Sequence, residues 1–405
     1  MNDKLRILLV ANSVPLPATD FLKYKLFGLS GQFDLHFICW DSEKNRDEFY
    51  RRYAGKLPAK NIHLFYEKLD WKNIIKSSFR NIARGLFAPH ISWPLLYKLG
   101  KAHHWNIRKI FTRFSLYFPI LALRPDIVHF EYGTLAHRFS DIKDYINCKT
   151  TVSFRGYDIN YTGLEDQDYY RQVWQNFDGF HFLGEDLKKR ALKRGYRPSK
   201  NEVLIPPGID TSFFGPSGNP KAEDKFIIVS VGRLAWKKGY EYGLQAVAGL
   251  KSKGISVEYR IIADGTYRQP ILFAISELGL EQDVRIIPAY SAEEVKQHLD
   301  EAHVFLHPAI SEGFSNAVLE AQAMQLPVVT TNADGLPENV EDGITGFVVP
   351  VYDATAMTER LEWCYNNRPS LQAMGAAGRQ RVLKYFTIEE QLEKFAAFYS
   401  RLNDE

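Results

Sequence analysis

Short apolar runs of strand length alternate with helical stretches along most of this chain, and this alternation is the feature that most limits the folds it can adopt. Chains that repeat strand and helix in this way form open sheets of parallel strands covered by helices. In the first half we expect helices at residues 21–29 and 185–194. Strands are expected at residues 5–11, 35–40, 62–66, 126–130, 150–154, 179–183 and 203–205.

A second series of the same kind follows. Residues 206–225 separate the two series and are dense in proline, glycine and polar residues, as is typical of an interdomain linker. At 405 residues the chain is also too long for one ordinary core. We therefore predict an α/β protein with doubly wound parallel-sheet domains over residues 1–205 and 226–385. The second domain has expected strands at 226–231, 257–263, 284–287, 304–306, 327–330 and 347–349, and helices at 240–253, 267–278, 354–366, 371–385 and 388–402.

Charge and cysteine content exclude several classes of protein. The net charge of +3 is too small to indicate a nucleic-acid-binding protein. The three cysteines, Cys39, Cys148 and Cys364, are far apart and predict neither a disulfide framework nor a zinc site. The longest uncharged apolar stretch, residues 114–123, is too short to cross a bilayer. We expect a cytoplasmic protein without a leader sequence.

One region has a strongly uneven charge. Residues 71–125 contain no acidic residue but carry ten lysines and arginines. Between residues 72 and 86 the cations recur every fourth position, and apolar residues recur at helical spacing on another face. Such a helix can lie on an anionic membrane, at the inner face of the membrane for a cytoplasmic protein. The alternative is a core-packed helix with a solvated basic face.

The stretch at residues 307–323, HPAISEGFSNAVLEAQA, joins a strand end to a helix through a loop that carries Glu312 and Gly313. The helix is expected to begin near Phe314 or Ser315, which leaves free backbone N–H groups that suit an anion. If residues 312–320 were all helical, Glu312 and Glu320 would lie about 12 Å apart along the axis. A hydrolytic pair needs less than about 10 Å, so the two fit hydroxyl groups on either side of a phosphate better. The alternative is a pair of solvated helix glutamates.

Cations follow the first strand of the second half in the segment VGRLAWKKG, residues 231–239. Arg233 can bind a diphosphate through two guanidinium N–H groups, and Lys238 can add the charge of its ammonium group. Gly232 and Gly239 flank these two residues in the sequence. Neither a dinucleotide fingerprint nor a Walker-type loop occurs, which argues against a dehydrogenase or a kinase. Fixed cations and helix amides can stabilise a departing diphosphate without a metal. The alternative is a loop with surface cations.

With these residues assembled, the chain resembles bacterial retaining glycosyltransferases of the large family four. The motifs that carry the resemblance are SVGRLAWKKG at 230–239, IADGTYR at 262–268, EGFSNAVLEA at 312–321, GLPENVEDGITGFVVP at 335–350 and IPPGIDTSFF at 205–214. The resemblance implies a GT-B architecture, in which two Rossmann-like domains face each other across a cleft. It also implies that a helix at residues 386–405 crosses back onto the first domain.

The same resemblance implies a set of site residues and no metal or other cofactor. Glu312, with Arg233 and Lys238, would carry catalysis. A nucleotide diphosphate sugar, with UDP as the expected carrier, would be bound by further residues of the second domain. Transfer would retain the anomeric configuration, with a glycan or polyprenyl-linked acceptor in cell-surface polysaccharide assembly. The donor-binding residues implied are Gly232, Gly313, Phe314, Ser315, Asn316, Glu320 and Tyr290.

The acceptor side is expected at strand ends of the first domain, with Glu131 and Tyr132 after one strand and Arg155 and Asp158 after the next. The family often has His-Gly-x-Asp where this chain has Arg155-Gly156-Tyr157-Asp158, and a guanidinium cannot act as a base at neutral pH. Arg155 would instead bind an anion, such as a lipid phosphate or a uronic acid carboxylate, or tie its loop to a nearby acid.

Other functions remain open for a chain of this type. A nucleotide-sugar 2-epimerase shares the architecture but needs acid and base carboxylates around the sugar and no acceptor groove. A sugar phosphorylase needs a cofactor lysine in another context. A non-catalytic two-lobed binding protein is normally exported. The basic region at 71–125 favours transfer to an acceptor at a membrane.

Overall fold

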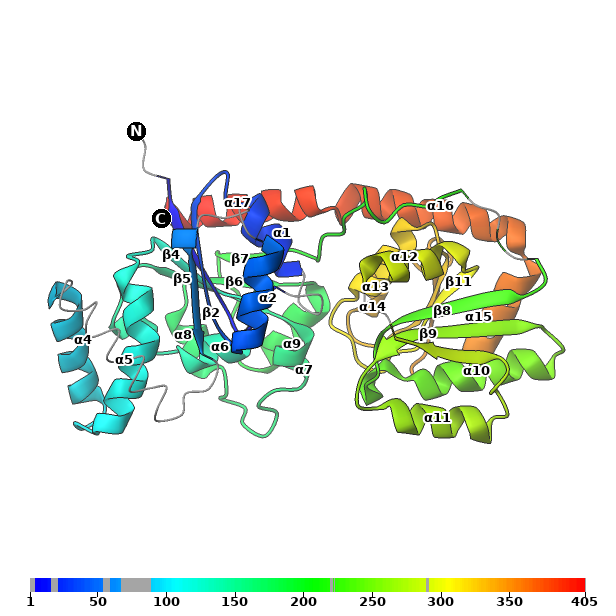
Figure 1. The fold of residues 1–405 in the computed structure, drawn as a ribbon, viewed down its shortest axis with the longest axis horizontal. Coiled ribbons are helices and arrows are strands. Elements are labelled where there is room, and N and C mark those ends of the chain that lie inside the picture. Colours follow the sequence, from blue (N-terminus) through cyan, green and yellow to red (C-terminus); the bar gives the residue numbers. More distant parts are fainter. Residues whose placement is uncertain are drawn as a thin grey trace. The chain divides into compact units, whose positions relative to one another are not determined.

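The computed structural model describes residues 4–15, 21–53, 59–66, 89–218, 221, 223–288 and 291–404. The chain divides into two compact units (Figure 1). Unit 1 comprises Met1–Phe182, Arg190–Ile205 and Leu392–Glu405. Unit 2 comprises Leu183–Lys189 and Pro206–Gln391. Each unit contains one parallel sheet, so the fold is that of two Rossmann-like domains.

Unit 1 is built on a seven-stranded parallel sheet in the order β3-β2-β1-β4-β5-β6-β7. The central strand β1 pairs with β2 and β4, with Leu9 opposite both Phe37 and His129. Its apolar residues are buried because helices cover both faces, as expected for a parallel sheet. The strands are β1 (Arg6–Ala11), β2 (Asp34–Asp41), β3 (Ile62–Tyr66), β4 (Ile127–Phe130), β5 (Lys149–Phe154), β6 (Gly179–Phe182) and β7 (Glu202–Leu204).

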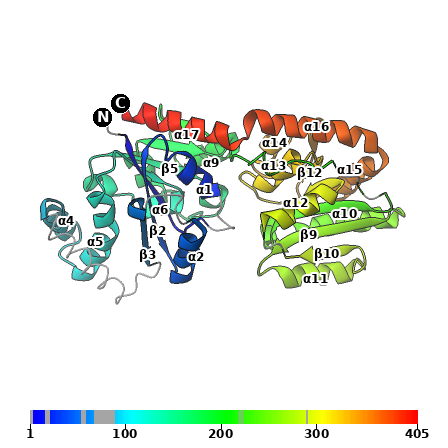
Figure 2. The ribbon, with the colours of Figure 1, turned by 45° about the horizontal axis from the view of Figure 1, so that its top comes forward.

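The helices of unit 1 include one that the chain contributes from its far end. Helix α17 runs beside α1 (Figure 2). Phe395, Phe398, Tyr399 and Leu402 of α17 pack in the same buried cluster as Leu26 of α1. Helix α17 therefore completes the core of unit 1. The helices wholly in unit 1 are α1 (Phe21–Gly28), α2 (Glu43–Tyr53), α4 (Pro89–Ala102), α5 (Ile107–Ala122), α6 (Gly133–Arg138), α7 (Gly156–Asn160) and α8 (Arg171–Asn176), with single 3-10 turns η2 (Ala59–Asn61) and η3 (Ile142–Asp144). Two helices, α9 (Glu185–Lys193) and α17 (Ile388–Asn403), begin in unit 2 and end in unit 1.

Unit 2 is built on a six-stranded parallel sheet in the order β10-β9-β8-β11-β12-β13. Strand β8 pairs along its whole length with β9, from Phe226 opposite Val257 to Arg233 opposite Asp264. The strands are β8 (Phe226–Arg233), β9 (Val257–Asp264), β10 (Val284–Ile287), β11 (Val304–His307), β12 (Val328–Thr331) and β13 (Gly346–Val349).

The core of unit 2 joins this sheet to helices α10, α11, α15 and α16. Ile228, Tyr259 and Leu306 of the sheet pack with Leu244 of α10 and Leu361 of α15. The remaining helices lie between strands or beside their ends. The elements are η4 (Trp236–Lys238), α10 (Tyr240–Ser252), α11 (Arg268–Glu277), α12 (Ala292–Glu301), α13 (Asn316–Ala323), α14 (Leu336–Asn339), α15 (Ala354–Asn366) and α16 (Arg368–Tyr385).

The thirteen strands expected from the sequence are confirmed, most of them within one or two residues. The helix of residues 72–86 lies outside the described residues. Helix α12 has no counterpart among the helices that the sequence analysis expected. Its signal is a capping box, in which Ser291 Oγ accepts from the Glu294 N–H and the Glu294 carboxylate accepts from the Ser291 N–H. Among the helices that the structure describes, none is long and apolar enough to cross a membrane.

Candidate active site

The loop between β11 and α13 is held against the loop that follows β8. Gly239 adopts a left-handed conformation with φ of 60°. A Cβ atom at this position would lie 2.2 Å from the carbonyl oxygen of Pro308, so only glycine allows the two loops to approach. The Lys237 carbonyl accepts from the Ile310 N–H at 2.9 Å and from the Ser311 N–H at 3.3 Å. These contacts bring the cationic segment next to Glu312.

Glu312 and Lys238 form a direct ion pair in this place. Both side chains are largely buried, with 14% and 13% of their surfaces exposed. The Nε2 atom of His307 lies 3.7 Å from the same Glu312 oxygen. Burial acts to raise the pKa of Glu312, but Lys238, with His307 and Lys237, outweighs it and lowers that pKa far below its usual value. Glu312 is therefore a carboxylate throughout the neutral range and can accept hydrogen bonds from hydroxyl groups.

The backbone of Glu312 is fixed by Asp334, which follows β12. One Asp334 carboxylate oxygen accepts from the Glu312 N–H at 2.9 Å and from the Ser311 hydroxyl at 2.7 Å. The Gly335 N–H donates to the Glu312 carbonyl at 3.1 Å. A Cβ atom on Gly335 would lie 2.1 Å from the Gly313 carbonyl oxygen. The loop that presents Glu312 is therefore held rigidly from the neighbouring strand end.

Helix α13 begins at Asn316 with Ser315 as its N-cap, close to the expected position. The Ser315 N–H donates to the side chain of Asn339 at 3.1 Å, and the Asn339 amide donates back to the Ser315 carbonyl at 3.0 Å. The amide of Ser315 is thus not open to a phosphate, contrary to expectation. Among the described residues, the N–H groups of Gly313, Phe314 and Asn316 have no hydrogen-bond acceptor. Three amides of this turn therefore remain available to an anion.

Glu320 lies on α13, and its carboxylate has no ion-pair or hydrogen-bond partner among the described residues. Burial raises its pKa to about 7. A carboxylate that is desolvated without a partner is unfavourable for the unliganded protein, and a ligand hydroxyl would relieve that cost. Glu320 therefore has the properties of a binding residue.

Arg233 ends strand β8, with its side chain exposed. Within the described part of the chain it forms no ion pair. Lys238 differs, because it is already paired with Glu312. A Cβ atom on Gly232 would lie 3.0 Å from the Tyr240 hydroxyl and 3.4 Å from the Lys238 side chain, so this glycine leaves room for the lysine. Tyr290, also implied as a donor-binding residue, lies outside the described residues.

In unit 1, Glu131 and Arg155 follow β4 and β5 and contact each other. Arg155 Nη2 lies 3.1 Å from the Glu131 carboxylate, and Arg155 Nε donates to the Glu131 carbonyl at 3.2 Å. Lys25 of α1 lies 2.7 Å from the other Glu131 oxygen. Burial lowers the pKa of Lys25 to about 8, although Glu131 acts in the opposite direction. Of the two roles left open for Arg155, the tie to a nearby acid is present in the structure.

Asp158 and Tyr132 hold the loops at the same strand ends. Asp158 is buried and accepts from the N–H groups of Thr134 and Arg155, both at 2.9 Å. It therefore caps both α6 and α7. Burial raises the pKa of Asp158. Tyr132 is the N-cap residue of α6, and the Arg155 guanidinium lies 5.4 Å from the centre of its ring.

Sequence reasoning missed a buried polar chain below these residues. His129 contacts Thr151 at 2.7 Å and Ser153 at 2.8 Å, and Ser153 contacts His181 at 2.7 Å. Burial lowers the pKa of both histidines well below the usual value, so they are neutral. The available signal was the alternation of polar residues on β4, β5 and β6, which places these side chains on one face of the sheet. Asp334 and Lys25 were missed because their partners, Glu312 and Glu131, are remote in sequence.

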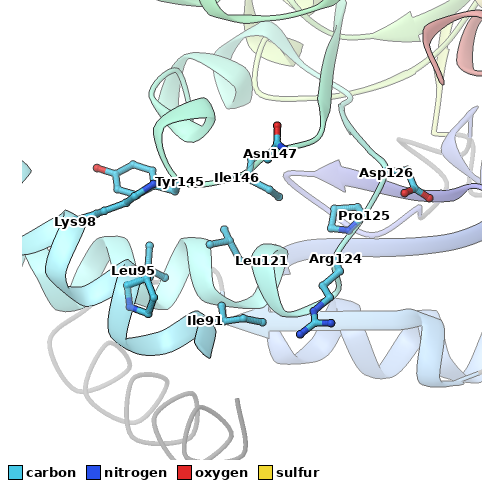
Figure 3. A pocket seen from close by; sticks show the side chains of 11 residues that line it. Ile91, Leu95, Lys98, Leu121, Arg124, Pro125, Asp126, Tyr145, Ile146 and Asn147 are labelled. Carbon is cyan, nitrogen blue, oxygen red and sulfur yellow. The ribbon is translucent and has the colours of Figure 1, made fainter. Parts of the chain in front are cut away.

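A separate hollow of about 410 Å³ lies in unit 1 beside α4 and α5 (Figure 3). Ile91, Leu95 and Leu121 line its apolar floor, and Lys98 and Arg124 lie at its two ends. Its other walls come from residues that precede β4 and β5. It therefore lies at the amino ends of the strands, whereas Glu131 and Arg155 lie at the carboxyl ends. This hollow is distinct from the candidate site residues.

Comparison with known proteins places unit 2 in a family. Residues 216–381 match the family model described as "Glycosyl transferases group 1". The chain is 29% identical over 286 residues to the amylovoran biosynthesis glycosyltransferase AmsK of Erwinia amylovora, covering 68% of this chain and 70% of that protein. It is 31% identical over 244 residues to the putative colanic acid biosynthesis glycosyltransferase WcaL of Escherichia coli, covering 58% of this chain and 60% of that protein.

Solved structures share the fold along the whole chain. A glycosyltransferase from Rickettsia africae matches with a TM-score of 0.73 at 17% identity, covering 99% of both chains. Anabaena HepE in complex with UDP and glucose matches with a TM-score of 0.73 at 15% identity, covering 98% of this chain and 100% of that one. The two Rossmann-like domains thus share the GT-B fold of these solved structures. From the family match, we conclude that residues 216–381 form a domain of the group 1 glycosyltransferases.

Proposed function

We propose that the protein is a retaining glycosyltransferase that moves a sugar from a nucleotide diphosphate sugar, with UDP as the expected carrier, to a glycan or lipid-linked acceptor. The observation that carries the proposal is the Glu312–Lys238 pair beside the amides of Gly313, Phe314 and Asn316 at the start of α13, which have no acceptor among the described residues. This arrangement offers an acceptor for sugar hydroxyls next to positive groups for a diphosphate. The names of AmsK and WcaL support a role in cell-surface polysaccharide assembly.

In the proposed complex, Glu312 accepts hydrogen bonds from the donor sugar, and its low pKa keeps it ionised for that task. Arg233, which has no ion-pair partner among the described residues, and Lys238 stabilise the charge that develops on the departing diphosphate. The amides of Gly313, Phe314 and Asn316 add to this effect. Glu320 accepts from a ribose hydroxyl. The acceptor attacks from the face that the diphosphate leaves, so the anomeric configuration is retained and no metal is needed.

The proposal includes contact between residues 71–125 and the inner face of an anionic membrane, where a lipid-linked acceptor would be presented. The sequence of the described residues 89–125 contains no acidic residue. It contains six lysines and arginines: Lys98, Lys101, Arg108, Lys109, Arg113 and Arg124. Such a charge distribution favours an anionic surface.

The first experiment measures release of nucleotide diphosphate from a panel of nucleotide sugars, with and without lipid-linked acceptors. Glu312→Ala and Lys238→Ala should each lower turnover at least about 100-fold, since each removes a group that stabilises the transition state. The matched control is the Lys253–Glu362 pair of unit 2, with 42% and 32% of its side-chain surfaces exposed. Lys253→Ala and Glu362→Ala should leave turnover unchanged. Wild-type rates in both site variants would refute the proposal.

Two further measurements test the finer parts of the proposal. Proton NMR of the product shows whether the anomeric configuration of the donor is kept. Adding EDTA should leave the rate unchanged, because the positive groups belong to the protein. Conversion of the donor into its C2 epimer without any acceptor would identify the epimerase instead.

A further inference from the structure

Large apolar side chains are unusually exposed on the hairpin formed by α4 and α5. Trp93 is 68% exposed, Tyr97 55%, Trp105 61% and Ile107 65%. Single exposed apolar residues are normal, but a group of this kind within fifteen positions marks an interaction surface. We call these four residues the hairpin stripe.

The three aromatic residues of the hairpin stripe are related by their places on the hairpin. Trp93 and Tyr97 are four residues apart on α4 and so lie on the same face of that helix. The rings of Tyr97 and Trp105 lie 6.5 Å apart, edge to face. A Cβ atom on Gly100 would lie 2.4 Å from the Trp105 ring, so the ring packs directly over the glycine backbone. Trp105 is therefore fixed against α4 although most of its surface faces solvent.

Cations border the hairpin stripe. The Lys101 ammonium lies 5.0 Å from the centre of the Tyr97 ring, and Arg108 and Lys109 occupy the first turn of α5. That turn contains no acidic residue. Two cations at the positive end of a helix repel its dipole, and an external anion would relieve this repulsion. A hollow of about 590 Å³ opens here, lined by His103, Asn106, Arg108, Lys109, Thr112 and Arg113, with no carboxylate among them.

From this arrangement we infer that the hairpin stripe docks on an anionic phospholipid bilayer. Trp93, Tyr97 and Trp105 enter the headgroup layer, where tryptophan and tyrosine are favoured. Arg108 and Lys109 contact lipid phosphates at the hollow. The aromatic groups and the cations lie on one hairpin, as in surface-bound amphipathic elements. The inference deepens the proposed function, because docking would bring the enzyme to lipid-linked acceptors.

The test is sedimentation of the full-length protein with vesicles of phosphatidylcholine alone or mixed with phosphatidylglycerol. Wild-type protein should bind the mixed vesicles but not the vesicles of phosphatidylcholine alone, and its binding should weaken as salt is added. Arg108→Gln/Lys109→Gln should bind the mixed vesicles about 25-fold more weakly, because each cation near an anionic surface contributes roughly fivefold. Trp93→Ser/Trp105→Ser should also reduce binding at least about tenfold.

Matched controls come from other surfaces of unit 1. Lys193→Gln/Arg197→Gln removes the same charge from exposed positions, and Tyr50→Ser removes a tyrosine that is 44% exposed. Both should bind like wild type. Thermal melting checks that every variant is folded. Because no sugar donor is present, vesicle binding and glycosyl transfer can fail independently.

Three results would overturn the inference. The first is equal binding to neutral and anionic vesicles. The second is wild-type binding by both hairpin variants, or no binding by any protein. The third is a dimer, found by light scattering, that the Trp93→Ser/Trp105→Ser substitutions dissociate while vesicle binding is unchanged, which would assign the surface to a second copy of this chain.

Discussion

The charged residues of the candidate site are of two kinds, those with an ion-pair or hydrogen-bond partner and those without an ion-pair partner among the described residues. Glu312 is held by Lys238 and Asp334, whereas Glu320 and Arg233 have no ion-pair partner among the described residues. Motif spacing placed Glu312 and Glu320 around a helix start, and the structure confirms a helix start at Asn316, between the two glutamates. The sequence could not predict that the Ser315 amide is occupied, because Asn339 is remote in sequence and its side chain reaches that amide only in the folded unit.

Glu320 gives the first prediction. Its folded pKa of about 7 lies above the usual 4.5, so the folded state binds the extra proton and stability falls as pH rises from about 4.5 to 7. Glu320→Gln should therefore raise the free energy of unfolding at pH 8 by at most about 3 kcal/mol, with little effect near pH 4. Denaturant unfolding at both pH values measures this. Glu277→Gln, an exposed glutamate of unit 2, is the control. An equal effect at both pH values would contradict the prediction.

Arg155 gives the second prediction. Replacing it with histidine removes a charged partner from buried Glu131, and we expect a loss of stability of about 1–3 kcal/mol. Turnover should change by no more than a few-fold, because Arg155 is used within the protein. Urea unfolding and the donor assay together measure both effects, with Arg171→His on the exposed surface as the control. A large loss of turnover at unchanged stability would show that Arg155 binds an external anion.

At the level of elements, strands were easier to predict than helices. Buried parallel strands such as β1 and β11 are continuous apolar runs, so their sequences are unambiguous. Helix α4 contains Pro94 and few polar residues, so its sequence shows no clear helical alternation of polar and apolar positions. Helix α2 is almost entirely polar, and its packing depends on Phe49 and Tyr53. Such helices are fixed by tertiary contacts that a local pattern does not reveal.

Helix α16 gives the third prediction. A Cβ atom on Gly375 would lie 2.0 Å from the Gln325 carbonyl oxygen, which is backbone and cannot move aside easily. Gly375→Ala should therefore push α16 away from the end of α13 and cost about 3 kcal/mol of stability. Gly31→Ala is the matched control, because nothing lies within 4 Å of that added atom. Thermal unfolding compares the two, and an unchanged melting temperature in Gly375→Ala would show that the backbone yields.

For the whole molecule, the division into units does not follow chain order. Unit 1 takes residues from three segments, including Leu392–Glu405, while Pro206–Gln391 of unit 2 is continuous. The resemblance implied that a terminal helix returns to the first domain, which periodicity alone did not reveal. The apolar residues of α17 recur at helical spacing, but their partners in α1 and β1 come from the other end of the chain.

Truncation gives the fourth prediction. Ending the chain at Gln391 removes Phe395, Phe398, Tyr399 and Leu402 from the core of unit 1. Each buried aromatic or leucine side chain contributes about 3 kcal/mol, so unit 1 should lose its cooperative unfolding while unit 2 keeps its own. Differential scanning calorimetry measures both transitions, and removal of residues 403–405 alone is the control. A single transition at the wild-type temperature would contradict this.

The late position of α17 also bears on how the protein forms during synthesis. Residues 206–391 leave the ribosome as one uninterrupted stretch and can fold as soon as they emerge. The earlier residues of unit 1 must wait, with the hydrophobic surface of α1 uncovered, until α17 has also been translated. In the cell, unit 1 can thus complete its core only after residues 206–391 have been translated, and its exposed apolar surface needs protection from aggregation during that interval.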